Sequence, residues 1–184
     1  MGNIVFVTGN QKKADNMARF LGLPIDHRKI NLDEIQSLHL EEIIEHKVRQ
    51  AYEIARVPVI VDDVGLAFTA LGGLPGPFIK FFVEQPDGNE KLCRMLDGFN
   101  DRSAVGMATV GYYDGANLKV FSGRIYGTIA DHPRGDGGYG WDVIFCPDGY
   151  DGKTRSELNP EEYEAVYRAI RPLDELKSYL QSIS

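Results

Sequence analysis

Two adjacent carboxylates, Asp62 and Asp63, follow a run of apolar, mostly β-branched residues, VPVIV at 57–61. Such a run predicts a buried strand, in which neighbouring side chains point to opposite faces. At a strand end the chain could turn, and both carboxylates could then approach one site. Their oxygens would suit Mg²⁺, and one of them could orient or deprotonate a water. The alternative is that one Asp caps the next segment while the other faces solvent.

The turn TGNQKK at 8–13 joins a predicted strand to a predicted helix and is the second candidate. Free N–H groups at a helix start, with the helix dipole, favour a phosphate. Thr8 and Asn10, on either side of Gly9, could donate hydrogen bonds, and Lys12 or Lys13 could add charge. The spacing is not that of a P-loop. The alternative is that Asn10 caps the helix and the lysines are solvated.

The glycine-rich segment PRGDGGYGWD at 133–142 predicts a loop that could bind a planar ligand. Glycines such as Gly140 let the backbone approach a ligand closely. Tyr139 and Trp141 could stack on a base, and Asp142 could accept a hydrogen bond from a ring or sugar donor. The alternative is a hairpin tip whose aromatic side chains cover the core.

Three further charged residues matter only if they converge on the same ligand. Glu34, in the loop NLDEIQS, is of interest as a partner for Asp63, because a site with one carboxylate holds magnesium weakly. Lys47 lies at the rim of a predicted apolar helix face, and Lys80 interrupts PFIKFF. Snorkelling to solvent is the default for both lysines, and neutralising a triphosphate is the alternative.

The elements that must position these residues follow from hydrophobic periodicity. The pattern predicts strands over 3–8, 25–30 and 57–61. It predicts helices over 9–22, with Gly22 as the stop signal, over 39–56 and over two short stretches within 78–99. A β-rich segment over 103–130 has a hairpin turn at Asp114-Gly115, and C-terminal helices over 160–183 are split near Pro172. This order predicts an α/β fold with a mixed sheet. We expect the β-rich middle to form a second lobe, with a cleft between the lobes.

Composition narrows the class of protein. The chain has 184 residues, 43% of them hydrophobic, which is typical of a globular domain, and its apolar runs are too short to span a bilayer. The net charge of −7 argues against non-specific binding to nucleic acid. The two cysteines, Cys93 and Cys146, lie far apart in the sequence and have no metal-ligand spacing, which fits a reducing, cytoplasmic setting.

Taken together, the segments resemble the inosine triphosphate pyrophosphatase family over nearly the whole chain. The segments that carry the resemblance are TGNQKK, LDEIQ, VDDVGLAF, ALGGLPGPFIKFF and GYGWD, in the order of the family's motifs. The likeness implies that Lys13 binds the phosphates beside Thr8 and Asn10, that Glu34 ligates a metal, and that Asp63 serves both the metal and the attacking water.

The same resemblance implies a fold and an activity. The fold would be a two-lobed α/β structure, a single nucleotide pyrophosphatase domain over 1–184, with an elongated mixed sheet flanked by helices and the active site in the cleft. The activity would be Mg²⁺-dependent hydrolysis of non-standard purine nucleoside triphosphates (ITP, dITP and XTP) to the monophosphate and pyrophosphate. Homodimers are usual in the family.

The base-binding end departs from the family pattern. After GYDGKTRSELNPEE the family has a Lys-Asn pair and then Ser-His-Arg. Here Glu162 stands in place of the lysine, Val166 and Tyr167 replace Ser and His, and Arg168 is retained. Two other functions therefore stay open, a pyrophosphatase acting on a pyrimidine or modified nucleotide and a non-catalytic nucleotide-binding protein.

Overall fold

The computed structural model describes residues 4–23 and 25–183. The elements follow in the order β1 (Val5–Val7), α1 (Gln11–Leu21), β2 (Asp26–Arg28), α2 (Leu40–Ala55), β3 (Val59–Phe68), the 3-10 turn η1 (Thr69–Leu71), β4 (Pro75–Gly76), α3 (Ile79–Val83), α4 (Gly88–Arg94), β5 (Ser103–Tyr113), β6 (Leu118–Ile129), β7 (Phe145–Pro147), η2 (Arg155–Glu157), α5 (Pro160–Ile170) and α6 (Leu173–Ser182). None of the described helices is both long enough and apolar enough to cross a membrane.

The strands form one mixed sheet, as predicted. Its order is β2-β1-β3-β5-β6-β7, with β4 paired to β3. β1 runs parallel to both β2 and β3, whereas β4 and β7 are antiparallel to β3 and β6. Parallel neighbours need crossover connections, and α1 and α2 supply them.

The chain divides into two compact units. The first comprises residues 1–63, 108–122 and 171–184, and the second comprises 64–107 and 123–170. The β5–β6 hairpin therefore contributes residues to both units. We expected the β-rich middle to form the second lobe. Its residues 103–107 and 123–130 do lie in the second unit, but residues 108–122 belong to the first.

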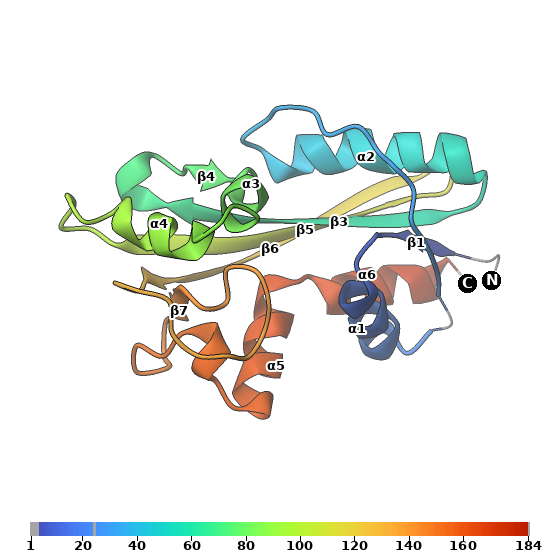
Figure 1. Ribbon diagram of the computed structural model, residues 1–184. Coiled ribbons are helices and arrows are strands. Elements are labelled where there is room, and N and C mark those ends of the chain that lie inside the picture. Colours follow the sequence, from blue (N-terminus) through green and yellow to red (C-terminus); the bar gives the residue numbers. More distant parts are fainter. Residues whose placement is uncertain (1–3, 24, 184) are drawn as a thin grey trace. The chain divides into compact units, whose positions relative to one another are not determined.

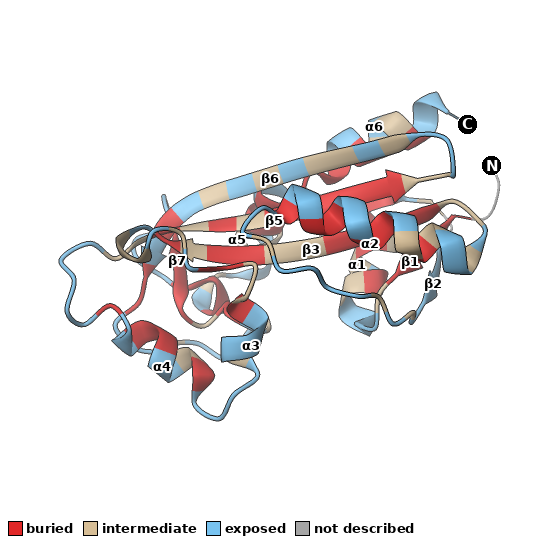
Figure 2. Ribbon diagram, turned by 90° about the horizontal axis from the view of Figure 1, so that it is seen from above, coloured by how far each residue is buried: buried red, intermediate tan, exposed pale blue. Residues whose placement is uncertain are grey.

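In the first unit, α2 packs on one face of the sheet and α1 and α6 on the other (Figure 1). The apolar stripe of α2 contributes Ile44, Val48 and Ala51 to a buried cluster with residues of β1 and β3. Gly111 of β5 allows this approach, since a Cβ there would collide with Ile44. This packing sets the height and rotation of α2 above β3. Figure 2 shows buried and exposed residues alternating along α2, which lies over largely buried parts of β3 and β5.

The β3 strand is longer than the sequence pattern predicts. The apolar run ends at Val61, but the strand continues through the two aspartates to Phe68. Beyond the aspartates the strand is apolar again: Leu66 and Phe68 are fully buried, and Leu66 lies opposite Gly76 of β4. The prediction that Asp62 and Asp63 stand at a strand end is therefore wrong, because the two carboxylates interrupt the apolar run without ending the strand.

Helix ends agree well with their sequence signals. Gly22 adopts a left-handed conformation, with φ of 63°, and ends α1. At α5, Asn159 Oδ1 accepts from Glu162 N at 2.9 Å, while Glu162 Oε2 accepts from Asn159 N at 3.0 Å. This reciprocal cap before Pro160 fixes the start of α5 in the second unit.

Candidate active site

Asp62 and Asp63 lie within β3 and point to opposite faces of the sheet. Asp62 Oδ1 accepts from Lys13 Nζ of α1 at 3.1 Å, and its side chain is 4% exposed. Asp63 Oδ2 accepts from Lys47 Nζ of α2 at 2.8 Å. Because α1 and α2 cover opposite faces in this unit (Figure 1), each aspartate is paired on its own side of the strand.

Glu34, Lys47 and Asp63 form the first functional cluster. Lys47 Nζ donates to Glu34 Oε1 at 2.7 Å and to Asp63 Oδ2 at 2.8 Å. The Lys47 residue is 7% exposed, whereas the side chains of Glu34 and Asp63 are 45% and 24% exposed. A buried ammonium therefore holds two solvent-accessible carboxylates against one another. The two acids are 29 positions apart in sequence, and only folding brings them to one nitrogen.

The charge state of Lys47 follows from this arrangement. Burial alone would lower the pKa of Lys47, but the nearby carboxylates of Asp63 and Glu34 outweigh that effect and raise it above its ordinary value. Lys47 is therefore a cation at neutral pH, bound where a cation is needed to offset two negative charges.

The donor set of this cluster fits a hard divalent ion. Two carboxylate oxygens that already converge on one cationic nitrogen can also converge on a metal, and oxygen ligands suit Mg²⁺. No cluster of three or more acidic, histidine or cysteine side chains suited to a metal occurs in residues 4–23 and 25–183. Mg²⁺ commonly takes one or two protein carboxylates and completes its shell with waters and phosphate oxygens, so Glu34 and Asp63 suffice.

The TGNQKK turn is organised by local hydrogen bonds. Asn10 is the N-cap of α1, with Oδ1 accepting from Lys13 N at 3.2 Å, and Thr8 Oγ1 accepts from Asn10 N at 3.1 Å. Gly9 is exposed between them. The cap fixes the first turn of α1 and so directs the Lys13 side chain to Asp62. The capping alternative for Asn10 is confirmed, and a phosphate role for the turn stays a prediction.

The glycine-rich loop lies in the second unit and its two aromatic residues differ in position. Trp141 is 7% exposed and packs edge-on against Phe145, with ring centroids 5.5 Å apart. Tyr139 is only partly buried. Trp141 thus belongs to the core, as the alternative for this loop held, whereas Tyr139 keeps surface that a planar ligand could cover. Asn89 Nδ2 donates to Gly140 O at 3.0 Å and tethers the loop to α4.

Asp142 is fully engaged with protein donors. The residue is 2% exposed. Its Oδ1 accepts from Arg155 Nη1 at 2.6 Å, and its Oδ2 accepts from Tyr163 Oη at 2.8 Å and from Tyr139 N at 2.9 Å. A carboxylate buried among three donors is placed to hold the loop rather than to receive a ligand's hydrogen bond directly.

Arg155 and Tyr163 bind the predicted site residue Asp142, although the sequence alone points to neither of them. Arg155 follows a threonine in the polar stretch KTRSEL, and Tyr163 lies in the first half of α5. Neither carries a local motif signal, since their common partner Asp142 is 13 and 21 positions away. A buried arginine requires a partner, but the sequence does not say that Arg155 is buried.

The remaining predicted residues lie on helices of the second unit. Lys80 is exposed on α3, and no described residue forms an ion pair with it. Arg168 is on α5, where its Nε lies 3.4 Å from Glu164 Oε1. Val166 and Tyr167, which stand in place of the family's Ser and His, are 0% and 3% exposed and belong to the core.

The predicted site residues thus form two groups. The first unit holds Thr8, Gly9, Asn10, Lys13, Glu34, Lys47, Asp62 and Asp63, and the second holds Lys80, Tyr139, Gly140, Trp141, Asp142 and Arg168. Within the first group the structure joins Glu34 to Asp63 through Lys47, and Lys13 to Asp62. The predicted cleft between lobes stays a prediction.

Comparison with known proteins shows which proteins the chain is similar to. The model of the Ham1 family matches residues 4–179. The inosine triphosphate pyrophosphatase of Scheffersomyces stipitis is 38% identical over 197 residues, covering 99% of this chain and all of that protein. Among solved structures, a HAM1 protein from Coxiella burnetii superposes with a TM-score of 0.86 at 26% identity, covering 99% of this chain and 100% of its own. The dITP/XTP pyrophosphatase of Mycobacterium abscessus gives 0.78 at 26% identity over 95% of this chain and 98% of its own.

These matches extend over both units and include every residue of the two groups described above. The seven-stranded mixed sheet is therefore the fold of these proteins. By the match of its whole length, this chain belongs to the Ham1 family.

Proposed function

We propose that this protein hydrolyses non-standard purine nucleoside triphosphates (ITP, dITP and XTP) to the nucleoside monophosphate and pyrophosphate. The observation that carries the proposal is the convergence of Glu34 and Asp63 on the Lys47 ammonium. The names of the relatives, an inosine triphosphate pyrophosphatase and a dITP/XTP pyrophosphatase, support the substrate class.

Glu34 and Asp63 would hold Mg²⁺, which when bound neutralises phosphate charge and lowers the pKa of water. Lys47 lies between the same two carboxylates. If another cation pairs with Glu34 and Asp63, the Lys47 ammonium would be positioned to bind phosphate oxygens instead. Lys13, held by Asp62, and the exposed Lys80 are the further cations that would bind the triphosphate.

The bond change follows from the products. A water oxygen attacks the α-phosphorus, the bond from that phosphorus to the oxygen bridging to the β-phosphorus breaks, and pyrophosphate leaves with the bonding electron pair. Asp63 accepts the water's proton as general base. Asp62 supports the reaction by holding Lys13, a further cation for the triphosphate, on the other face of β3. Lysine ammonium groups stabilise the charge that develops on the phosphate oxygens, an effect that is strong where water is excluded.

The test is a panel of nucleoside triphosphates assayed with and without Mg²⁺, with the products separated by ion-exchange chromatography. We expect IMP and pyrophosphate from ITP, and the corresponding monophosphates from dITP and XTP, all dependent on Mg²⁺. ATP and GTP serve as matched substrates with amino-substituted bases. Orthophosphate in place of pyrophosphate would mean that a different bond is cut and would refute the proposal.

A second candidate function is hydrolysis of a pyrimidine or modified nucleotide by the same chemistry. The observation that favours it is the burial of Val166 and Tyr167 where the family has Ser and His, because core side chains cannot read the edge of a purine. Including UTP, CTP and their deoxy forms in the panel separates the two candidates by relative kcat/KM.

The homodimer implied by the family resemblance and the cytoplasmic location predicted from the cysteines belong to the same proposal. The two cysteines, both free and buried, support a reducing compartment. Sedimentation equilibrium over a range of concentrations tests the oligomeric state, and a mass of 20.5 kDa would refute the dimer.

A further inference from the structure

We infer that Arg155 and Tyr163 are positioning residues for the nucleobase: they hold the Asp142 carboxylate, which fixes the backbone of Tyr139 and so presents its ring to the base. The inference rests on the proposed function, because it assumes that Tyr139 contacts the base of a nucleotide. It assigns a specificity role to two residues in place of a direct contact from Asp142.

The Asp142 carboxylate is saturated with hydrogen bonds from protein donors. Its two oxygens accept from three donors, each within 2.9 Å, while the residue is 2% exposed. A direct hydrogen bond to a base would require Asp142 to break one of these contacts and return to solvent, which is costly for a buried charge. The carboxylate therefore acts on the ligand through the groups that it holds.

Arg155 is buried between two aromatic rings. This residue is 3% exposed, and its guanidinium carbon lies 5.3 Å from the Trp141 ring centroid and 5.0 Å from the Tyr163 ring centroid. The cation is thus surrounded by two aromatic side chains and neutralised by Asp142. Arg155 Nε is buried without a hydrogen-bond partner in the described part of the chain, and the two ring contacts stabilise the guanidinium group as a whole.

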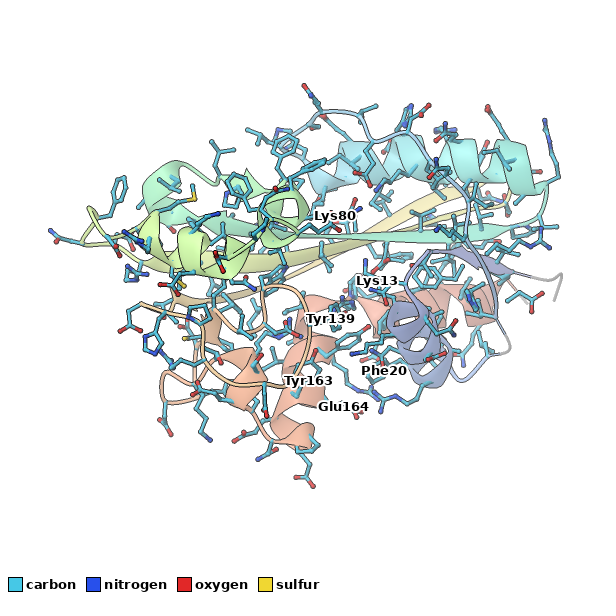
Figure 3. All side chains as sticks on the ribbon, in the orientation of Figure 1. Lys13, Phe20, Lys80, Tyr139, Tyr163 and Glu164 are labelled. Atoms are coloured by element: carbon cyan, nitrogen blue, oxygen red, sulfur yellow. The ribbon has the colours of Figure 1, made fainter. Side chains whose placement is uncertain are left out.

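The Tyr163 hydroxyl keeps its proton. Burial, together with the nearby Asp142 charge, raises the pKa of Tyr163 far above its ordinary value. Its hydroxyl therefore stays a donor to Asp142 at any working pH. Figure 3 labels Tyr163 on α5 and Tyr139 on the loop, the two residues that meet at Asp142 Oδ2.

The loop from Gly137 to Asp142 is held by Asp142 and by the residues around Arg155. Ser156, next to Arg155, donates from Oγ to Gly137 O at 2.6 Å and from its backbone N to Asp142 O at 3.2 Å. Gly138 has a φ of 70°, and a Cβ there would collide with Asp142 Oδ2. The loop from Gly137 to Asp142 is therefore seated on η2 and α5, and the angle of Tyr139 depends on that seat.

The experiment compares Tyr163→Phe with wild type, using ITP as substrate and inorganic tripolyphosphate as a competitive inhibitor. Tripolyphosphate has no base and reports on the lysine-rich end alone. Loss of one hydrogen bond to a carboxylate should raise the KM for ITP about 3- to 10-fold, with kcat changed less than about 2-fold. The Ki of tripolyphosphate and the melting temperature should stay at wild-type values.

Arg155→Lys is the second variant, because it keeps the charge but loses the planar group between two rings. We expect a larger rise in the KM for ITP, about 10- to 100-fold, again with an unchanged Ki for tripolyphosphate. Tyr126→Phe is the matched control, since Tyr126 lies on β6 and is 59% exposed. It should behave as wild type in every assay.

Each outcome decides the matter. An unchanged KM for ITP in both variants refutes the inference, as does a parallel loss of tripolyphosphate affinity and thermal stability, which would mean a structural role only. If wild-type protein releases no pyrophosphate from any nucleotide, the proposed function fails instead. The two failures are therefore distinguishable in one set of measurements.

Discussion

Asp62 and Asp63 share a peptide bond, yet they pair with lysines on opposite faces of the β3 strand. Asp62 binds Lys13 of α1 and Asp63 binds Lys47 of α2. The alternation of side chains along a strand imposes this separation. Two acids that look like one pair in the sequence therefore serve two different cations.

The first prediction contrasts the two aspartates. Asp63→Asn removes the proposed general base and should lower kcat by at least about 100-fold while nucleotide binding and melting temperature are retained. Asp62→Asn instead loosens Lys13, so it should weaken inhibition by tripolyphosphate about 3- to 10-fold with a smaller effect on kcat. Steady-state kinetics of pyrophosphate release measures both. Normal turnover in Asp63→Asn would remove that residue from the mechanism.

The second prediction concerns the ammonium between Glu34 and Asp63. Lys47→Met keeps the apolar stem but leaves two carboxylates facing each other without a counter-charge, which is destabilising. We expect a lower melting temperature in EDTA than for wild type, and a larger rise than wild type when Mg²⁺ is added. Differential scanning fluorimetry with and without Mg²⁺ checks this. Equal Mg²⁺-induced shifts in the two proteins would contradict a shared site for the ammonium and the metal.

The third prediction tests the packing that sets the height of α2. Gly111→Ala places a methyl group against Ile44 and should cost about 1–3 kcal/mol of unfolding free energy. Gly98→Ala is the matched control, because a Cβ there meets nothing within 4 Å. Urea denaturation compares the two. Similar stabilities for both variants would show that α2 can move away from β5 at little cost.

The fourth prediction uses the η2 turn beside Arg155. The Thr154 backbone N–H, with Arg134 nearby, lowers the pKa of Glu157 below its ordinary value of 4.5. A lowered pKa means that the ionised form stabilises the fold above about pH 4.5 and that this gain is lost as pH falls through the folded-state pKa. Glu157→Gln should therefore be about 1 kcal/mol less stable at pH 7.

That difference should shrink in acid, as the carboxylate of wild-type Glu157 takes up a proton. Urea denaturation at pH 7 and at pH 3 measures it. Glu161→Gln, at an exposed position of α5, serves as the control. A penalty of the same size at both pH values would mean that the charge of Glu157 contributes nothing.

The sequence predicted most elements because their signals are local. The apolar stripe of 39–56 became α2 at Leu40–Ala55, Gly22 ended α1, and the Asp114-Gly115 turn joined β5 to β6. The end of β3 was missed, because Asp62 and Asp63 interrupt its apolar run, although Leu66 and Phe68 beyond them are fully buried. The partition of the hairpin between two units was missed because it depends on contacts between residues far apart in the sequence.

The sequence by itself determined the family, the mixed α/β fold and the residue types that could do the chemistry, because motifs and periodicity are properties of neighbouring positions. Only the tertiary structure decided that Lys47 joins Glu34 to Asp63 and that Asp62 points to the opposite face of β3 from Asp63. It also decided that Asp142 is buried and hydrogen-bonded to Arg155 and Tyr163. Those relationships depend on which strand faces and helices meet, and partners 13 to 49 positions apart leave no local trace in the chain.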